Sequence, residues 1–245
     1  MTEFITLRDK IRFALLPKRQ YLAYQARRAS RRGESELEML QFLVPRGRNA
    51  IDGGAHKGIY SWYLSKFCRE IYAFEPNPAM FDYLSHAVPG NVRCFYAALS
   101  RTTGKATFHI PTSKGRFHHT RGSLLDVEGE TGCASIETEV HTIDQHHFPD
   151  VGFIKLDLEG AELDALRGGV ELIRRDRPVI LAEATGVGGS SPGELTKYLL
   201  ELGYLPLVYR EGRLMHLGKQ TAQSISHNCF FLPEESMNIA CQKAA

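Results

Sequence analysis

The sequence is poor in the features that mark exported or membrane-embedded proteins. Its five cysteines are odd in number and form no C-x-x-C pair; they are Cys68, Cys94, Cys133, Cys229 and Cys241. Neither a disulfide framework nor a cysteine-based zinc site is therefore indicated. No apolar run approaches the roughly 20 residues of a membrane-spanning helix, and the N-terminus lacks the apolar core of a signal peptide. We expect a soluble protein of the reducing cytoplasm.

A strong excess of charge is also absent. The formal net charge is +2, with 43% hydrophobic and 24% charged residues, which is typical of a soluble globular protein and too weakly basic to indicate a nucleic-acid partner. Only the first 48 residues are locally basic, with eleven Lys or Arg against five acidic residues. We interpret residues 1–33 as a basic N-terminal helical extension with solvated charges; contact with an anionic partner is the alternative.

The most informative stretch runs from Asn49 to Ser61 and reads NAIDGGAHKGIYS. A short apolar segment ends in Asp52, glycines follow at positions 53, 54 and 58, and amphipathic sequence begins near Tyr60. This order predicts a strand, a tight turn and a helix. Glycine permits positive φ or close approach to a ligand there, and the amide groups that begin the helix favour an anionic group.

Strand and helix patterns alternate along most of the chain. The predicted strands cover residues 70–75, 91–99, 151–157, 178–183, 204–209 and 227–233, in addition to the one that ends at residue 52. The predicted helices cover residues 34–44, 61–67, 78–87, 159–166 and 194–202, and a hairpin turn is predicted at 211–212. Such alternation predicts a mostly parallel sheet with helices on both faces.

The rhythm changes between residues 100 and 150. Residues 105–110 and 135–142 have the pattern of half-exposed strands, and the loop between them, 111–134, is rich in glycine and unusually long. Such a loop often forms a lid or a substrate wall. We expect one α/β domain over residues 34–235, with the extension before it and a C-terminal tail at 236–245.

The glycine spacing favours a methyl-donor site over a dinucleotide site. A dinucleotide fingerprint needs glycine where the chain has Ala55. The spacing from Asp52 to Gly58 instead fits a cradle for S-adenosylmethionine, with the acid near the amino acid moiety. Glu75, at the end of the second strand, is predicted to accept hydrogen bonds from two ribose hydroxyls. Glu75 alone would equally suit an NAD-dependent enzyme.

Five blocks in this order resemble the FkbM family of S-adenosylmethionine-dependent methyltransferases: residues 51–61, 74–78, 97–100, 153–163 and 228–233. The block with the sequence LDLEGAE is the most specific, and the resemblance spans residues 34–233. It implies a Rossmann-like class I methyltransferase fold, with a mostly parallel seven-stranded sheet and an antiparallel final strand. It also implies O-methylation of a hydroxyl of a sugar, glycan or secondary metabolite. Family members usually have asparagine at the position of His56.

The residues expected to bind the methyl donor lie in the first three blocks and at the end of the fourth strand. They are Asp52, Gly53, Gly54, Ala55, His56, Gly58, Ser61, Glu75, Pro76, Asn77, Ala97, Ala98 and Asp157. For His56, a side chain that only fills the turn and one that contacts the ligand are both retained.

Catalytic candidates follow from the demands of in-line methyl transfer, which needs alignment of donor and acceptor and, for a hydroxyl, a base. Asp157 is the first candidate to orient the acceptor or the methionine amine, followed by Glu159 and Glu183, because open α/β sheets bind ligands at the carboxyl ends of strands. His119 is a candidate base from the long loop. Asp157 and Glu183 together would also suit Mg²⁺, but no third ligand is evident, so this alternative is retained without being favoured.

Two other functions remain open on the sequence. The first is a non-catalytic cofactor-binding scaffold of the same fold, and the second is an NAD-dependent oxidoreductase. The partner expected of a methyltransferase is a small-molecule or glycan acceptor. Neither nucleic acid nor a membrane span is indicated, and the oligomeric state is left open.

Overall fold

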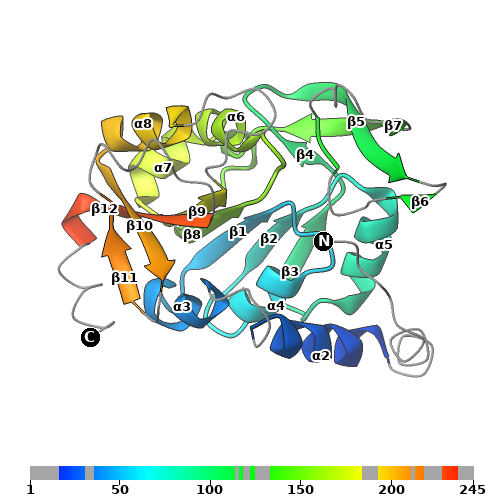
Figure 1. Cartoon of the computed structure of the whole chain (residues 1–245), viewed down its shortest axis with the longest axis horizontal. Helices are drawn as coiled ribbons and strands as arrows, with labels where there is room; N and C mark the ends of the chain where they lie inside the picture. Colours follow the sequence, from blue (N-terminus) through cyan, green and yellow to red (C-terminus); the bar gives the residue numbers. More distant parts are fainter. Residues whose placement is uncertain are drawn as a thin grey trace.

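The computed structural model describes residues 17–30, 36–113, 116–117, 122–124, 133–183, 193–210, 213–217 and 228–236. An eight-stranded sheet lies between two layers of helices (Figure 1). Its strands are β1 (Asn49–Gly53), β2 (Ile71–Phe74), β3 (Val92–Phe95), β8 (Val151–Leu156), β9 (Val179–Glu183), β10 (Tyr204–Arg210), β11 (Arg213–His216) and β12 (Asn228–Pro233). Across the sheet they follow the order β11-β10-β12-β9-β8-β1-β2-β3.

The sheet is mostly parallel, as the alternating patterns predict. The five strands from β3 to β9 in the spatial order pair in parallel. The final strand, β12, is antiparallel to both of its neighbours, β9 and β10, which confirms the antiparallel final strand. The sheet has eight strands rather than seven because β11 folds back on β10 and extends the edge by one strand.

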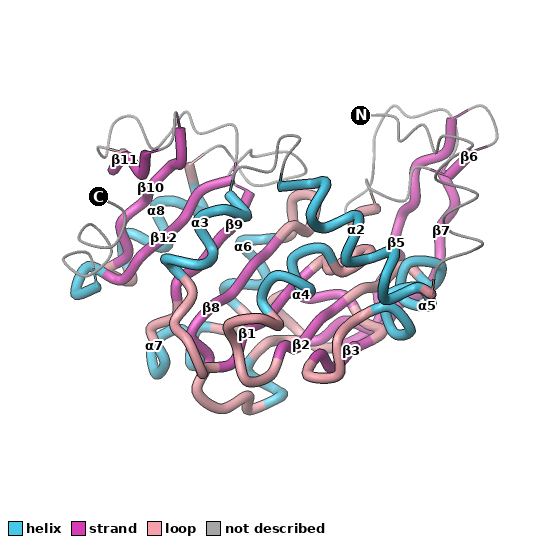
Figure 2. Tube along the Cα trace, turned by 90° about the horizontal axis from the view of Figure 1, so that it is seen from below, coloured by secondary structure: helices cyan, strands magenta, loops and turns pink. Residues whose placement is uncertain are grey.

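Helices cover both faces of the sheet, as predicted. The helices on one face are α6 (Glu162–Arg167), α7 (Val170–Asp176) and α8 (Glu194–Glu201), and those on the other are α2 (Lys18–Ser30), α3 (Glu36–Leu43), α4 (Ile59–Leu64) and α5 (Pro78–Ala87). Neighbouring residues of β8 divide between the two layers: Phe153 packs with α3 and α4, and Ile154 packs with α6 and α7. Figure 2 shows α4 over β1 and β2.

A second, smaller sheet stands beside the first. Its strands, in spatial order, are β4 (Ala98–Leu99), β7 (Cys133–His141), β5 (Gly104–Ser113) and β6 (Arg116–Phe117). The prediction of a single strand at residues 91–99 is wrong, because β3 ends at Phe95 and the chain then leaves the main sheet. Ala97 and Leu99 are buried in the core with α6, so the last residues of the predicted strand pair with β7 instead of β2.

Part of the long loop at 111–134 returns to this second sheet. The backbone of Ser123 exchanges two hydrogen bonds with that of His109 in β5, at 2.8 and 3.0 Å. This bridge carries Gly122 and Leu124 towards the carboxyl edge of the main sheet. His119 lies outside the described residues.

Helix α2 packs against α4 and α5, two of the helices that cover the main sheet. The side chain of Leu22 is fully buried in a cluster with Tyr83 and Leu84 of α5, and α2 also contacts α4. The division between an extension at 1–33 and a domain at 34–235 stays a prediction. In the part of the chain that the structure describes, no helix is long and apolar enough to cross a membrane.

The burial of Leu22 leads to a prediction about stability. We expect Leu22→Ala to lower the free energy of unfolding by about 2–4 kcal/mol, because it removes buried methyl groups and leaves a cavity between α2 and α5. Arg19→Ala on the exposed side of the same helix is the control and should change it by less than about 0.5 kcal/mol. Urea denaturation of the two variants measures the difference. Equal stability of both would mean that α2 does not belong to the cooperative unit.

Candidate functional site

The neighbouring parallel strands β2, β1 and β8 end at the same edge of the main sheet. The last residue of β1, Gly53, is in register with Phe74 of β2 and with Leu156 of β8. The next residue of each strand, namely Gly54, Glu75 and Asp157, therefore lies at the carboxyl edge of the sheet. Open α/β sheets bind their ligands at this edge.

The turn after β1 requires glycine at position 54. Gly54 has a φ of 70°, and a Cβ built on it would stand 2.0 Å from the carbonyl oxygen of Asp157. Gly58, with a φ of 87°, is the N-cap residue of α4, and a Cβ there would meet the side chain of Leu84 at 2.8 Å. The turn is thus in backbone contact with the end of β8, and the space that a side chain would need at position 54 is filled by the carbonyl group of Asp157.

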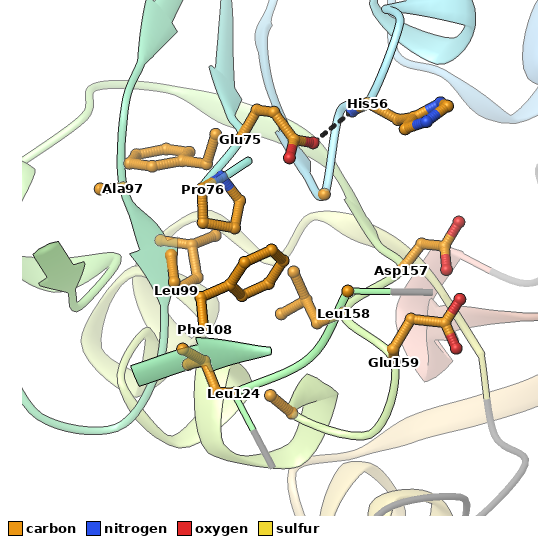
Figure 3. Close-up of a pocket in the computed structure, with 15 residues that line it drawn as sticks. His56, Glu75, Pro76, Ala97, Leu99, Phe108, Leu124, Asp157, Leu158 and Glu159 are labelled. Atoms are coloured by element: carbon orange, nitrogen blue, oxygen red, sulfur yellow. Dashed lines mark hydrogen bonds between the residues drawn. The ribbon is translucent and has the colours of Figure 1, made fainter. Parts of the chain in front are cut away.

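His56 contributes its backbone to the site. It adopts a left-handed φ of 50°, which asparagine tolerates more readily than histidine. Its N–H donates to Oε2 of Glu75 at 2.7 Å, and its imidazole points away from that carboxylate (Figure 3). The bond to Glu75 therefore uses the backbone of residue 56 and not its imidazole.

Glu75 is a buried carboxylate held by two backbone amides. Besides the N–H of His56, the N–H of Asn77 donates to its Oε1 at 2.8 Å. Burial raises the pKa of Glu75 to about 7. The two N–H bonds and the charge of Lys155 oppose this rise, whereas the charge of Asp52 adds to it. Each carboxylate oxygen has a second lone pair that can accept a hydroxyl hydrogen bond.

Asp52, the single acidic residue of β1, is fully buried behind the turn. The hydroxyl of Ser61 donates to its Oδ2 at 2.6 Å. Its Oδ1 accepts no hydrogen bond within the described part of the chain. The ammonium of Lys155 lies close by, with its Nζ at 3.6 Å from Oδ1.

A pocket opens between the end of β2 and the loop after β8 (Figure 3). Of the predicted cofactor and catalytic residues, those that line it are Gly54, His56, Glu75, Pro76, Ala97, Ala98, Asp157 and Glu159. Asp157 and Glu159 both belong to the loop after β8 and are labelled on the right of Figure 3. The hydroxyl of Ser123 donates to the carbonyl oxygen of Glu159 at 2.9 Å, so the bridge from the second sheet supports the loop that carries this acid.

The remaining predicted residues surround the pocket without lining it. Gly53 ends β1, while Ala55, Gly58 and Ser61 belong to the turn and the start of α4. Asn77 caps α5 by accepting the N–H of Ala79 at 3.1 Å. Glu183 ends β9 one position after Ala182, which is in register with Leu156. It therefore stands next to Asp157 across the strands.

Several lining residues were not predicted. They are Phe74, Leu99, Phe108, Gly122, Leu124, Leu158 and Ala161. Phe74, Leu99, Leu158 and Ala161 lie within the sequence blocks that resemble the family, whereas Phe108, Gly122 and Leu124 belong to β5 and the bridge at Ser123, which have no recognisable site motif. Buried Lys155 was also missed, although a lysine within an otherwise apolar strand was visible in the sequence.

Metal ligands are not gathered at this edge. Among the described residues, no group of three or more His, Cys, Asp or Glu side chains could hold a metal ion. What these residues offer is a bare-backbone turn, a carboxylate for hydroxyl groups, and two acids at the pocket mouth. Such a set can bind a nucleoside with a polar extension and orient a second polar molecule beside it.

The contact at position 54 leads to a prediction. We expect Gly54→Ala to lower the free energy of unfolding by about 3 kcal/mol or more, because the methyl group collides with backbone that cannot move aside cheaply. Gly47→Ala is the matched control, since Gly47 also has a positive φ, 77°, but a Cβ there meets nothing within 4 Å. It should cost about 1–2 kcal/mol. Guanidinium denaturation compares the two variants, and equal losses would argue against the collision.

Comparison with known proteins places this site in a family. A model of the methyltransferase FkbM domain matches residues 52–206, which is more than half of the chain. The hexuronic acid methyltransferase AglP of Haloferax volcanii is 29% identical over 154 residues, which cover 61% of this chain and 60% of that protein. Methyltransferase sdnD of Sordaria araneosa is 24% identical over 159 residues, which cover 51% of this chain and 61% of that protein.

These matches span less than two thirds of either relative. Among solved structures, methyltransferase FkbM from Methylobacillus flagellatus superposes with a TM-score of 0.51 at 17% identity, over 76% of this chain and 43% of that one. At this identity the likeness concerns the fold alone, and it agrees with the Rossmann-like architecture predicted from the sequence. The resemblance to the FkbM family is confirmed, and the block at residues 228–233 lies outside the matched range. The chain belongs to the family of proteins with a methyltransferase FkbM domain.

Proposed function

We propose that this protein is an S-adenosylmethionine-dependent methyltransferase that methylates a hydroxyl group. Membership of the FkbM domain family supports this function. The observation that carries the proposal is the arrangement of Glu75 beside Gly54. A buried carboxylate whose two oxygens are fixed by backbone amides ends one strand, the Gly54 turn ends the neighbouring strand, and both line one pocket.

The residues present fit this cofactor. Glu75 would accept the ribose hydroxyls, Pro76 and Ala97 would line the side of the base, and the turn at Gly54 would lie along the amino acid end. The unpartnered Oδ1 of Asp52 behind that turn can accept a hydrogen bond from a water or an ammonium group. S-adenosylmethionine would supply an electrophilic methyl group on a sulfonium ion.

The two acids that line the pocket after β8 are assigned one to the donor and one to the acceptor. Asp157 would orient the amino group of the donor, and Glu159 would hold the acceptor hydroxyl and take its proton as the oxygen forms its bond to the methyl carbon. The electron pair of the broken carbon–sulfur bond stays on sulfur. Alignment of this kind supplies much of the rate, and a base adds about 10²- to 10⁴-fold.

The acceptor class rests on the relatives. One relative carries the name of a hexuronic acid methyltransferase, and we extend this to a hydroxyl of a sugar, glycan or secondary metabolite. Glu183, next to Asp157 across the strands, would widen the polar surface available to such a polyol. A cytoplasmic location stays a prediction.

Isothermal titration with S-adenosylhomocysteine tests the proposal first. The folded protein should bind it, and Glu75→Gln should bind at least about tenfold more weakly, because a buried hydrogen-bond acceptor of the ribose is replaced. Release of S-adenosylhomocysteine is then screened with uronic acids, neutral sugars and phenols as acceptors. Binding without turnover on any acceptor would favour the non-catalytic scaffold, and a response to NAD alone would favour the oxidoreductase.

The raised pKa of Glu75 leads to a prediction about pH. Because ribose hydroxyls donate to the ionised carboxylate, and the pKa of Glu75 is about 7, most carboxyls are protonated at pH 6 and must lose a proton on binding. The affinity for S-adenosylhomocysteine should therefore rise about tenfold between pH 6 and pH 8. Glu75→Gln has no proton to lose, so its weaker affinity should not vary over this range. A wild-type affinity that is flat over the same range would contradict the assignment.

A further inference from the structure

Lys155 is a buried cation in the centre of the main sheet. It occupies the fifth position of β8, whose other residues are apolar or glycine and are all buried. Its side chain is only 6% exposed. Burying an ammonium group costs several kcal/mol unless opposite charges and hydrogen bonds replace its hydration. The buried Nζ therefore requires polar partners.

The shortest of these contacts is to the backbone of the turn. Nζ donates to the carbonyl oxygen of Gly54 at 3.0 Å and lies 3.4 Å from that of Gly53. These two carbonyl groups belong to the segment that must stay in contact with the end of β8. The ammonium therefore ties the turn to the strand that carries it.

Two carboxylates share the same ammonium. Oδ1 of Asp52 is 3.6 Å from Nζ, and Oδ2 of Asp157 is 3.5 Å from it. Burial alone would lower the pKa of Lys155, but the charges of Asp157 and Asp52 outweigh this effect, and the pKa lies above its ordinary value. Lys155 therefore stays charged between the two acids.

Neutralisation of the Asp52 charge does not by itself explain where the Nζ of Lys155 lies. A lysine with that role alone would approach the buried carboxylate most closely, yet Nζ gives its shortest bond to the carbonyl of Gly54. It also lies as close to Asp157, whose side chain is 46% exposed and can be solvated by water. The ammonium thus links a buried acid, the turn and an acid of the pocket mouth.

We propose that Lys155 is a positioning residue for the amino acid end of the methyl donor, which it aligns by fixing the Gly54 carbonyl and one oxygen of Asp157. This inference rests on the proposed function. The other oxygen of Asp157 is then directed to the donor's amino group, while the Gly54 turn is held open before the ligand arrives. Such preorganisation lowers the cost of ordering the site on binding.

Two nucleosides distinguish this role from support of the fold. S-adenosylhomocysteine carries the amino acid end, whereas 5′-methylthioadenosine has the same nucleoside and thioether without it. We expect Lys155→Met to weaken binding of the first by about tenfold or more and to change binding of the second by less than about twofold. Lys66→Met, at an exposed lysine of the turn following α4, is the control and should alter neither affinity. Both affinities are measured by isothermal titration well above pH 7, so that Glu75 is ionised even where the charge of Lys155 no longer lowers its pKa.

The variant Lys155→Met leaves Asp52 buried without a cation. If it does not fold, the same comparison is made between Asp52→Asn and the double variant Asp52→Asn, Lys155→Met, in which no buried charge is left unpaired. Unchanged affinity for S-adenosylhomocysteine, or an equal loss for both nucleosides, would overturn the positioning role. Folded wild-type protein that binds neither nucleoside would overturn the proposed function and this inference together.

Discussion

The backbone of Gly54 and the carbonyl oxygen of Asp157 lie so close that no side chain fits between them. This contact joins the end of β1 to the end of β8, two segments about one hundred residues apart in the chain. The amide of His56 reaches Glu75 only because the turn follows this path, and the ammonium of Lys155 reaches the Gly54 carbonyl for the same reason. The polar groups of the site thus depend on a backbone contact that any residue but glycine would disturb.

Parallel pairing supplies the second constraint. Because β2, β1 and β8 are in register, their first residues beyond the sheet meet along one edge, and an acid follows two of the three strands. Like charges gathered in this way would repel one another in a medium of low dielectric constant. The buried ammonium of Lys155 offsets the charges of Asp52 and Asp157, and backbone amides stabilise the charge of Glu75.

Local chemistry explains which parts of this arrangement could be read from the sequence. Gly54, Gly58 and Glu75 were identifiable because turn geometry and strand ends impose residue types at short range. The apolar wall from Phe108 and Leu124 was not, since it depends on a second sheet whose pairing joins distant segments. The break after Phe95 was missed for a similar reason: burial of Ala97 and Leu99 overrides the strand pattern.

The position of β12 has a consequence for how the chain folds during synthesis. This strand comes last in the sequence, yet it lies between β9 and β10 in the interior of the sheet. Until residues 228–233 have left the ribosome, those two neighbours have no hydrogen-bonding partner on their facing edges, and unpaired edges invite association with other chains. The sheet of a nascent chain is therefore incomplete until β12 has been synthesised. Chaperones that shield the unpaired edges of β9 and β10 would matter most during that interval.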